Sequence, residues 1–183
     1  NQFYNIADGV ILLSSAEGWG LSLTEALLTG TPIIANVTGG MQDQMRFEDK
    51  DGNWIDIDEN IQSNHRGTYK TNGEWAFPVY PTSLSLVGSP KTPYIWDDRC
   101  TPEDAAKQIR ALYDMSKKER KEIGKAGYDW VTSKEAGFTA QVQGERVIEG
   151  MDELFKKFKP RKSFTFTKDT DIERKVLNHK LIY

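Results

Sequence analysis

Residues 10–40 read VILLSSAEGWGLSLTEALLTGTPIIANVTGG, and the fold class can be inferred from their pattern. Its apolar run at 10–13 is typical of a short parallel strand that is buried on both faces. A loop of small residues follows, and the pattern at 21–29 then predicts a helix that ends before Gly30. A second short apolar strand is expected at 33–35. A strand, a helix and another strand in such close succession form a right-handed crossover unit, which predicts an α/β fold.

The segments on either side of this unit have a different character. Residues 2–6 are expected to be the end of a helix, and the pair Gly39-Gly40 ends the crossover unit. From about residue 43 to residue 100 we expect an irregular insert, because prolines recur there and disfavour long regular elements. Within the insert, 74–80 and 83–87 are either the strands of a hairpin or parts of an ordered loop.

Three helices are predicted after the insert. Thr101-Pro102 supplies an N-cap and a proline at the first helical position, and Ser116 forms a capping box with Glu119 for the second helix. A third helix is expected to start near Ser133 and to end at Pro160. The apolar positions at helical spacing are Ala106, Ile109, Leu112 and Tyr113 in the first helix, Ile123, Ala126 and Trp130 in the second, and Phe138, Val142, Ile148, Met151, Phe155 and Phe158 in the third.

The composition of the 183 residues excludes several classes of protein. Apolar residues make up 38% of the chain, which is far more than disordered chains contain, so a core can form. No apolar run is long enough to span a membrane. Cys100 is the only cysteine, so no disulfide can form within the chain, and a reducing, cytoplasmic location is expected.

The net charge of −3 hides an uneven distribution of charge. Residues 1–155 carry 15 Lys and Arg against 24 Asp and Glu, whereas residues 156–180 carry nine against three. The acidic body disfavours nucleic acid as the main partner. The basic C-terminal part is predicted to dock on an acidic surface of another domain or on anionic lipid, and the alternative is a solvated tail. Its apolar positions also favour a homo-oligomer; they include Phe155, Phe158, Phe164, Phe166, Ile172, Val176, Leu177, Leu181 and Ile182.

The glycine loop between the first strand and the first helix is the segment that carries chemistry. Gly18 and Gly20 would let a ligand approach the backbone closely, and a helix that follows such a loop suits a phosphate or diphosphate. The alternative is a tight glycine turn that only packs. Two carboxylates favour the binding interpretation, because Glu17 precedes the turn and Glu25 lies one turn into the helix.

This segment resembles the donor-binding signature of retaining glycosyltransferases with the two-domain GT-B fold, in the family 4-like group of glycogen synthases and mannosyltransferases. The matching residues agree with that pattern in order and spacing over about residues 3–44. They are Tyr4, Ala7, Asp8, Leu13, Ser14, Glu17-Gly18-Trp19-Gly20, Glu25-Ala26, Gly30-Thr31-Pro32 and Gly39-Gly40. The resemblance implies a Rossmann-like parallel sheet that is part of the C-terminal, donor-binding domain of such an enzyme.

The resemblance also implies a role for each residue of the loop. Glu17 would contact the donor sugar near the reacting carbon and is the catalytic candidate, whereas Glu25 would hydrogen-bond the ribose hydroxyls of the nucleotide. The backbone around Gly20, Leu21 and Ser22 would receive the diphosphate or the sugar, which completes a donor-binding set of Gly18, Trp19, Gly20, Leu21, Ser22 and Glu25. Asp43 stands where the family usually has an acid. The alternative for each carboxylate is an ordinary solvated side chain.

The implied reaction is transfer of a hexose from a nucleotide-diphosphate sugar to an acceptor, with retention of configuration and without a metal or other cofactor. The family places its acceptor domain, and the Arg and Lys that neutralise the diphosphate, upstream of this signature. We therefore expect a fragment that is inactive alone, with a donor-binding domain at 1–159 and a C-terminal tail at 160–183. The alternatives are a nucleotide-sugar-binding module without catalysis, or an epimerase or phosphorylase of similar fold.

Other chemistry-bearing residues favour structural roles. Asp49, Asp51, Gly52 and Asp58 superficially resemble a calcium loop, but the spacing of the ligands fits poorly and a solvated acidic loop is favoured. His65 and His179 are isolated, which disfavours zinc. The three tryptophans of the insert are expected to fill a small core, and stacking on a sugar or a base is the alternative; they are Trp54, Trp75 and Trp96.

Overall fold

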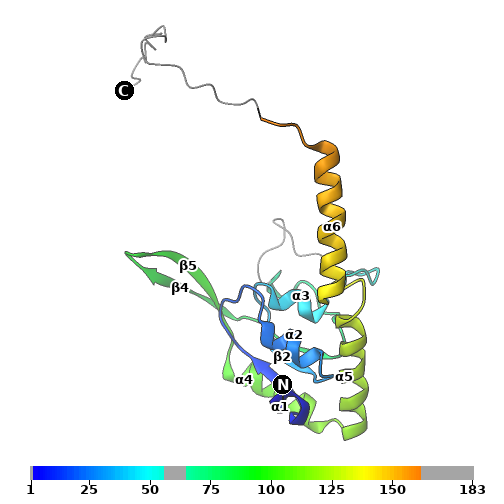
Figure 1. The fold of residues 1–183 in the computed structure, drawn as a ribbon. Helices are drawn as coiled ribbons and strands as arrows, with labels where there is room; N and C mark the ends of the chain where they lie inside the picture. Colours follow the sequence, from blue (N-terminus) through cyan, green and yellow to red (C-terminus); the bar gives the residue numbers. More distant parts are fainter. Residues whose placement is uncertain (1, 56–64, 162–183) are drawn as a thin grey trace, which may run out of the picture. The chain divides into compact units, whose positions relative to one another are not determined.

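A three-stranded parallel sheet forms the centre of the fold in the computed structural model, which describes residues 2–55 and 65–161 (Figure 1). The strands are β1 (Val10–Leu12), β2 (Ile33–Asn36) and β3 (Ala76–Val79), and β2 pairs in parallel with both of the others. The chain divides into two compact units, residues 1–145 and residues 146–183, and the sheet belongs to the first. The predicted α/β class and the parallel sheet are confirmed.

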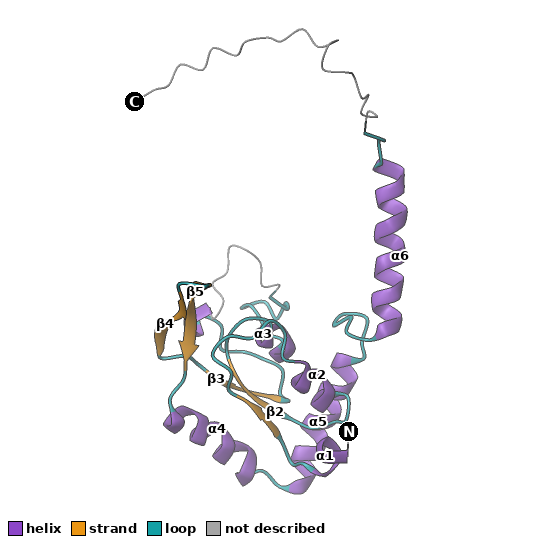
Figure 2. Cartoon of the chain, turned by 60° about the vertical axis from the view of Figure 1, so that its left-hand side comes forward, coloured by secondary structure: helices purple, strands orange, loops and turns teal. Residues whose placement is uncertain are grey.

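Helices cover both faces of the sheet (Figure 2). The helices α2 (Leu21–Leu27), α3 (Met41–Met45) and α5 (Lys117–Val131) share one cluster of buried residues with Ile33 and Ala35 of β2. On the other face, α4 (Pro102–Asp114) packs with Ile34. Because successive side chains of a strand point to opposite faces, the apolar run of β2 contributes to both clusters.

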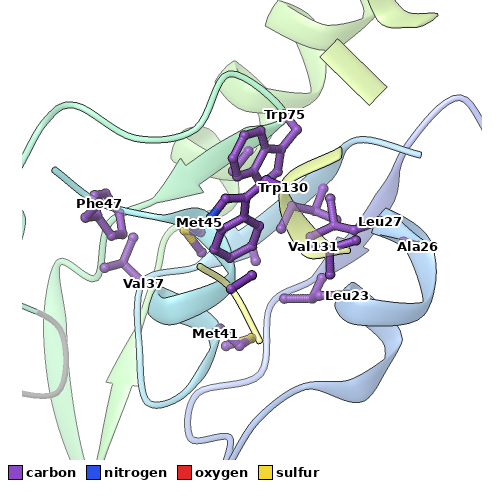
Figure 3. Packing of buried hydrophobic residues seen from close by; sticks show 14 of the residues in the cluster. Leu23, Ala26, Leu27, Val37, Met41, Met45, Phe47, Trp75, Trp130 and Val131 are labelled. Atoms are coloured by element: carbon purple, nitrogen blue, oxygen red, sulfur yellow. The ribbon is translucent and has the colours of Figure 1, made fainter. Parts of the chain in front are cut away.

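The larger cluster holds most of the buried hydrophobic residues (Figure 3). Trp75 and Trp130 stack with their ring centroids 5.0 Å apart, and both are almost completely buried. Leu23, Leu27 and Val131 lie in the same cluster and are completely buried. Burial of this apolar surface is the main favourable term in folding, so this cluster holds α2 and α5 against the sheet.

The local signals for helix ends are confirmed. The helix α1 spans Gln2–Ile6, and Gly30 takes a left-handed conformation with φ +71° after α2. The Thr101 side chain accepts a hydrogen bond from the Asp104 amide at the start of α4. Ser116 and Glu119 form both hydrogen bonds of the capping box at the start of α5. Each of these signals acts within a few residues, which is why the sequence reveals them.

The insert contains more regular structure than its sequence predicts. Residues 76–79, which could have been one strand of a hairpin, instead form β3 in the main sheet, where Pro78 is tolerated because β3 is an edge strand. The hairpin is formed by β4 (Ser83–Ser89) and β5 (Thr92–Arg99), which pair antiparallel. The short helix α3 lies at the start of the insert, and a 3₁₀ turn, η1 (His65–Gly67), lies within it.

Two predictions about the later helices are corrected. In α4 the buried apolar residues are Ala105 and Leu112, whereas Ile109 and Tyr113 line an open groove of about 740 Å³ beside β1. The third helix, α6, spans Ala140–Lys157 and thus begins seven residues after Ser133. Phe138 precedes it in a loop, where its ring packs edge-on to the buried Trp130, an arrangement that aromatic pairs favour.

The structure describes residues 146–161 of the second unit. The large apolar side chains in this range are exposed. Within α6 and just after it they occur at helical spacing, at Val147, Ile148, Met151, Leu154, Phe155 and Phe158. The segment after residue 161 lies outside the described residues, so the predicted alternation at 164–167 and the later apolar positions stay predictions. The proposed division at residue 159 also stays a prediction.

Candidate functional site

The loops that follow β1 and β2 meet at the carboxyl edge of the sheet, where open α/β sheets bind their ligands. The Gly40 amide donates to the Glu17 carbonyl at 3.3 Å. A Cβ atom on Gly39 would lie 2.1 Å from that carbonyl oxygen, and one on Gly40 would lie 2.3 Å from the Gly18 oxygen. The paired glycines are therefore required because the two backbones pack directly against each other.

The predicted catalytic and donor-binding residues surround this contact. Glu17 is half-buried in the loop, and Gly18 is exposed with open space where a side chain would be. Gly20 is buried and has φ +79°, a conformation that favours glycine, and it caps the start of α2. Leu21 is exposed and Ser22 is half-buried. The loop thus presents backbone and one carboxylate at a partly open edge.

Trp19 points toward the protein rather than into solvent. Its indole Nε1 donates to the Thr24 hydroxyl at 3.0 Å, and its ring packs edge-on to Phe138 with the centroids 4.8 Å apart. Its backbone carbonyl accepts a hydrogen bond from the Gln44 side chain. Trp19 therefore holds the loop against the core, and its predicted part in donor binding stays a prediction.

Glu25 lies on the exposed face of α2, one turn after Leu21. Its carboxylate accepts a hydrogen bond of 2.8 Å from the Tyr4 hydroxyl of α1, and this bond raises the pKa of Tyr4 above its usual value. A shallow pocket of about 260 Å³ is lined by these two residues with Leu28 and Thr29. The structure thus joins Glu25 to Tyr4 of the lead-in segment, and it places Glu17 in the loop against the paired glycines.

A buried carboxylate that the sequence did not reveal ties the hairpin to the same edge of the sheet. Asp98 of β5 accepts a hydrogen bond of 2.6 Å from the Thr38 hydroxyl, and its amide donates to the Ser15 carbonyl. The Asn36 side chain donates to the Ser14 and Asp98 carbonyls. The base of the hairpin is therefore fixed to the segments just before Glu17 and just before Gly39. Nothing local distinguishes Asp98 from Asp97 in the sequence.

The glycine loop lies within a region that is similar to known proteins. Residues 1–67 match the family model of glycosyl transferases group 1. The matched segment includes β1, the glycine loop, α2, the paired glycines and both candidate glutamates. This match supports glycosyltransferase activity in general terms, and it agrees with the parallel sheet. A search of the curated proteins finds no match to the chain.

The other candidates behave as structural elements. The Asp49 carboxylate accepts hydrogen bonds from the backbone amides of Asp51 and Asn53 and from the Asn53 side chain. These bonds lower the pKa of Asp49, and the bond from the Asn53 side chain has the largest effect. Asp58 and His179 lie outside the described residues. His65 is buried beside Phe47, and burial lowers its pKa. In the ranges 2–55 and 65–161, no three His, Cys, Asp or Glu side chains gather closely enough to hold a metal ion.

The tryptophans of the insert separate into two groups. Trp75 is in the core, and Trp54 is half-buried against Trp130 with the ring centroids 5.7 Å apart. Trp96 of β5 is 64% exposed, so it alone among the three presents its ring to solvent. Across the described part of the chain, no helix combines the length and the apolar character needed to cross a membrane.

Proposed function

We propose that this chain binds a nucleotide-diphosphate sugar and belongs to an enzyme that transfers the sugar, a hexose, to an acceptor with retention of configuration. The single observation that carries the proposal is the family match over residues 1–67, which spans the glycine loop and its supporting glycines. A backbone loop held this closely, at the carboxyl edge of a parallel sheet, is suited to a diphosphate.

The proposed roles follow from the chemistry of each group. The Glu25 carboxylate accepts hydrogen bonds from the ribose hydroxyls and would exchange its bond to Tyr4 for them. Glu17, at the turn, contacts the hydroxyls of the donor sugar near the reacting carbon. The backbone amides of Gly20, Leu21 and Ser22 meet the diphosphate or the sugar. Catalysis then consists of orienting the donor and stabilising the departing diphosphate, with no metal required.

The cations that neutralise the diphosphate have to come from beyond this loop. Residues 1–45 contain no Lys or Arg, and a departing diphosphate needs positive charge in the transition state. We therefore propose that a further acceptor-binding domain supplies these cations in the complete enzyme, and that residues 1–183 alone do not transfer sugar. The single cysteine, Cys100, is in keeping with a cytoplasmic enzyme.

The absence of Lys and Arg from residues 1–45 also favours a second candidate function, binding of a nucleotide sugar without transfer. A module that binds a nucleotide sugar without transferring it would need the loop and Glu25 but not a stabilised leaving group. The two functions differ in one measurable respect, because only the transferase releases a nucleoside diphosphate from the donor in the presence of an acceptor. An epimerase or a phosphorylase of similar fold is a less favoured alternative, because the spacing of Glu17 and Glu25 resembles the transferase signature.

Isothermal titration of the chain with UDP, GDP and ADP tests the binding step. We expect Glu25→Ala to weaken binding about tenfold or more, because charge-assisted hydrogen bonds to ribose are lost. Glu74→Ala is the matched control, since Glu74 is an exposed carboxylate away from the loop. Unchanged affinity in Glu25→Ala would refute the assignment of Glu25, and no binding of any of the three nucleotides would refute the proposed function.

A second experiment concerns Glu17. In the complete enzyme, Glu17→Gln should lower turnover while nucleoside-diphosphate affinity stays close to that of the wild type, because Glu17 contacts the sugar and not the nucleotide. Robust donor-dependent transfer by residues 1–183 alone would contradict the proposal that the catalytic cations lie elsewhere.

A further inference from the structure

Gln44 is a buried polar residue on α3, and its side chain contacts the backbone of the glycine loop. Its amide nitrogen Nε2 donates to the carbonyls of Trp19 and of Gly20, the latter at 3.3 Å. Its amide oxygen accepts a hydrogen bond of 2.7 Å from the Thr24 hydroxyl. Gln44 is completely buried, so these bonds form away from solvent, where breaking one leaves an unpaired polar group.

The orientation of the Gln44 amide follows from the groups around it. The backbone carbonyls of Trp19 and Gly20 can only accept, so the atom of Gln44 that faces them is the donor Nε2. The Thr24 hydroxyl accepts from the Trp19 indole, which can only donate, and its own proton is directed at Gln44. Oε1 of Gln44 therefore faces Thr24, and Nε2 faces the two loop carbonyls. The Gln44 backbone is held as well, because the buried Trp75 indole donates to its carbonyl at 3.1 Å. No flipped arrangement of the amide satisfies all of these groups.

This arrangement fixes the direction of two successive peptide groups in the loop. In a trans peptide the N–H points opposite to the C=O of the same unit. With the Trp19 carbonyl directed at Gln44, the Gly20 N–H is directed away from it. The Gly20 carbonyl accepts both from Gln44 and, at 2.9 Å, from the Leu23 amide of α2. It therefore directs the Leu21 N–H away from the buried Gln44 amide, and Leu21 is 69% exposed.

We propose that Gln44 is a positioning residue, which orients the Trp19–Gly20 and Gly20–Leu21 peptides so that their N–H groups meet the diphosphate or the sugar of the donor. The inference rests on the proposed function for the identity of the ligand. The orientation itself rests on hydrogen bonds within the protein. Gln44 acts through the loop and is not proposed to touch the substrate. The paired glycines also contact the loop, and Gly40 directly precedes α3, which carries Gln44.

Two variants separate orientation from packing. Gln44→Met keeps a long side chain of similar size but removes both polar atoms. Gln44→Glu keeps an acceptor for Thr24, but the ionised carboxylate cannot donate to the loop carbonyls. When protonated it becomes a donor again. Gln108→Met is the matched control, because Gln108 also donates to a backbone carbonyl, that of Pro78, on the α4 face of the sheet.

The first measurement needs no nucleotide. In ¹H–¹⁵N spectra of the folded chain, we expect Gln44→Met to shift the Gly20 and Leu21 amide signals and the Trp19 indole signal, while Gln108→Met leaves them in place. Unchanged signals in a folded Gln44→Met chain, as judged by circular dichroism, would overturn the inference. This result is independent of the proposed function.

The second measurement is titration with UDP, GDP and ADP. We expect Gln44→Met to weaken binding about tenfold, and the affinity of Gln44→Glu relative to the wild type to recover as the pH falls from 8 to 5 and the new carboxyl group becomes protonated. A packing role alone predicts no such recovery. If the wild type binds a nucleotide and both variants bind it equally well at every pH, the inference fails and the proposed function stands. If the wild type binds none, the proposed function fails and the spectra decide whether Gln44 orients the loop.

Discussion

The glycine loop and the β4–β5 hairpin leave the same edge of the sheet, yet they are held in opposite ways. The loop is held along its length through its backbone. Gly39 and Gly40 pack on the backbone of Glu17 and Gly18. The Gln44 side chain donates to the carbonyls of the next two residues, Trp19 and Gly20. The hairpin is held at its base by Asp98, and its apolar side chains are exposed. Those side chains are Leu84, Leu86, Val87, Tyr94, Ile95 and Trp96.

This difference shows where the sequence is constrained. Where two backbones touch, no side chain larger than hydrogen fits, so the residue type is dictated at that position. On an exposed ribbon, alternation of residue types is enough to form the strands, and many side chains would serve. We therefore expect small changes in the loop to cost much more stability than larger changes on the hairpin.

The largest effect is expected from Gly40→Ala. The added Cβ would lie 2.3 Å from the Gly18 carbonyl oxygen, so the loop must move. We expect the free energy of unfolding to fall by about 3 kcal/mol, as for overpacking in a core. Gly18→Ala is the control, because nothing lies within 4 Å of the new methyl group, and it should change stability by about 0.5 kcal/mol or less. Urea denaturation measures both, and equal effects would refute the close contact.

A smaller effect is expected at the base of the hairpin. Asp98→Ala leaves the buried Thr38 hydroxyl without its acceptor, which typically costs about 1–3 kcal/mol. Asp97→Ala removes only an ion pair with the exposed Arg99, so we expect a loss of about 1 kcal/mol or less. Denaturant midpoints of the two variants compare them directly. Similar losses would mean that the hairpin is not anchored by Asp98.

The exposed face of the hairpin should tolerate substitution. Leu86 is 54% exposed, and Leu86→Ala should change the free energy of unfolding by about 0.5 kcal/mol or less. A loss well above 1 kcal/mol, measured by the same denaturation, would show that this face is covered in solution. In that case the hairpin would be as sensitive to substitution as the glycine loop, against our expectation.

The second unit offers the smallest expected effect on stability. Phe155 and Phe158 are 66% and 61% exposed, so replacing both with Ser should leave the unfolding midpoint unchanged. We expect the wild-type chain to self-associate through such exposed apolar residues and the double variant to be monomeric in light scattering. A wild-type chain that is monomeric in light scattering would contradict the predicted homo-oligomer.

The sequence predicted the crossover unit well and the insert poorly. Gly30, Thr101, Ser116 and Glu119 marked helix ends through hydrogen bonds or backbone conformations that involve only near neighbours. The start of α6 was placed too early because Phe138 continues the helical spacing while packing on Trp130 instead. The roles of Glu17 and Glu25 in donor binding stay predictions.

The α/β class, the glycine loop and the positions of its candidate residues could be inferred without the structure, because apolar periodicity and capping act over short separations in the chain. The folded chain was needed to show that residues 76–79 complete the parallel sheet, that Asp98 bonds to Thr38, and that Gln44 holds the loop. These contacts join residues 24–60 positions apart. A buried polar side chain finds its partner only after the apolar core has brought distant segments together, and no local pattern encodes that partner.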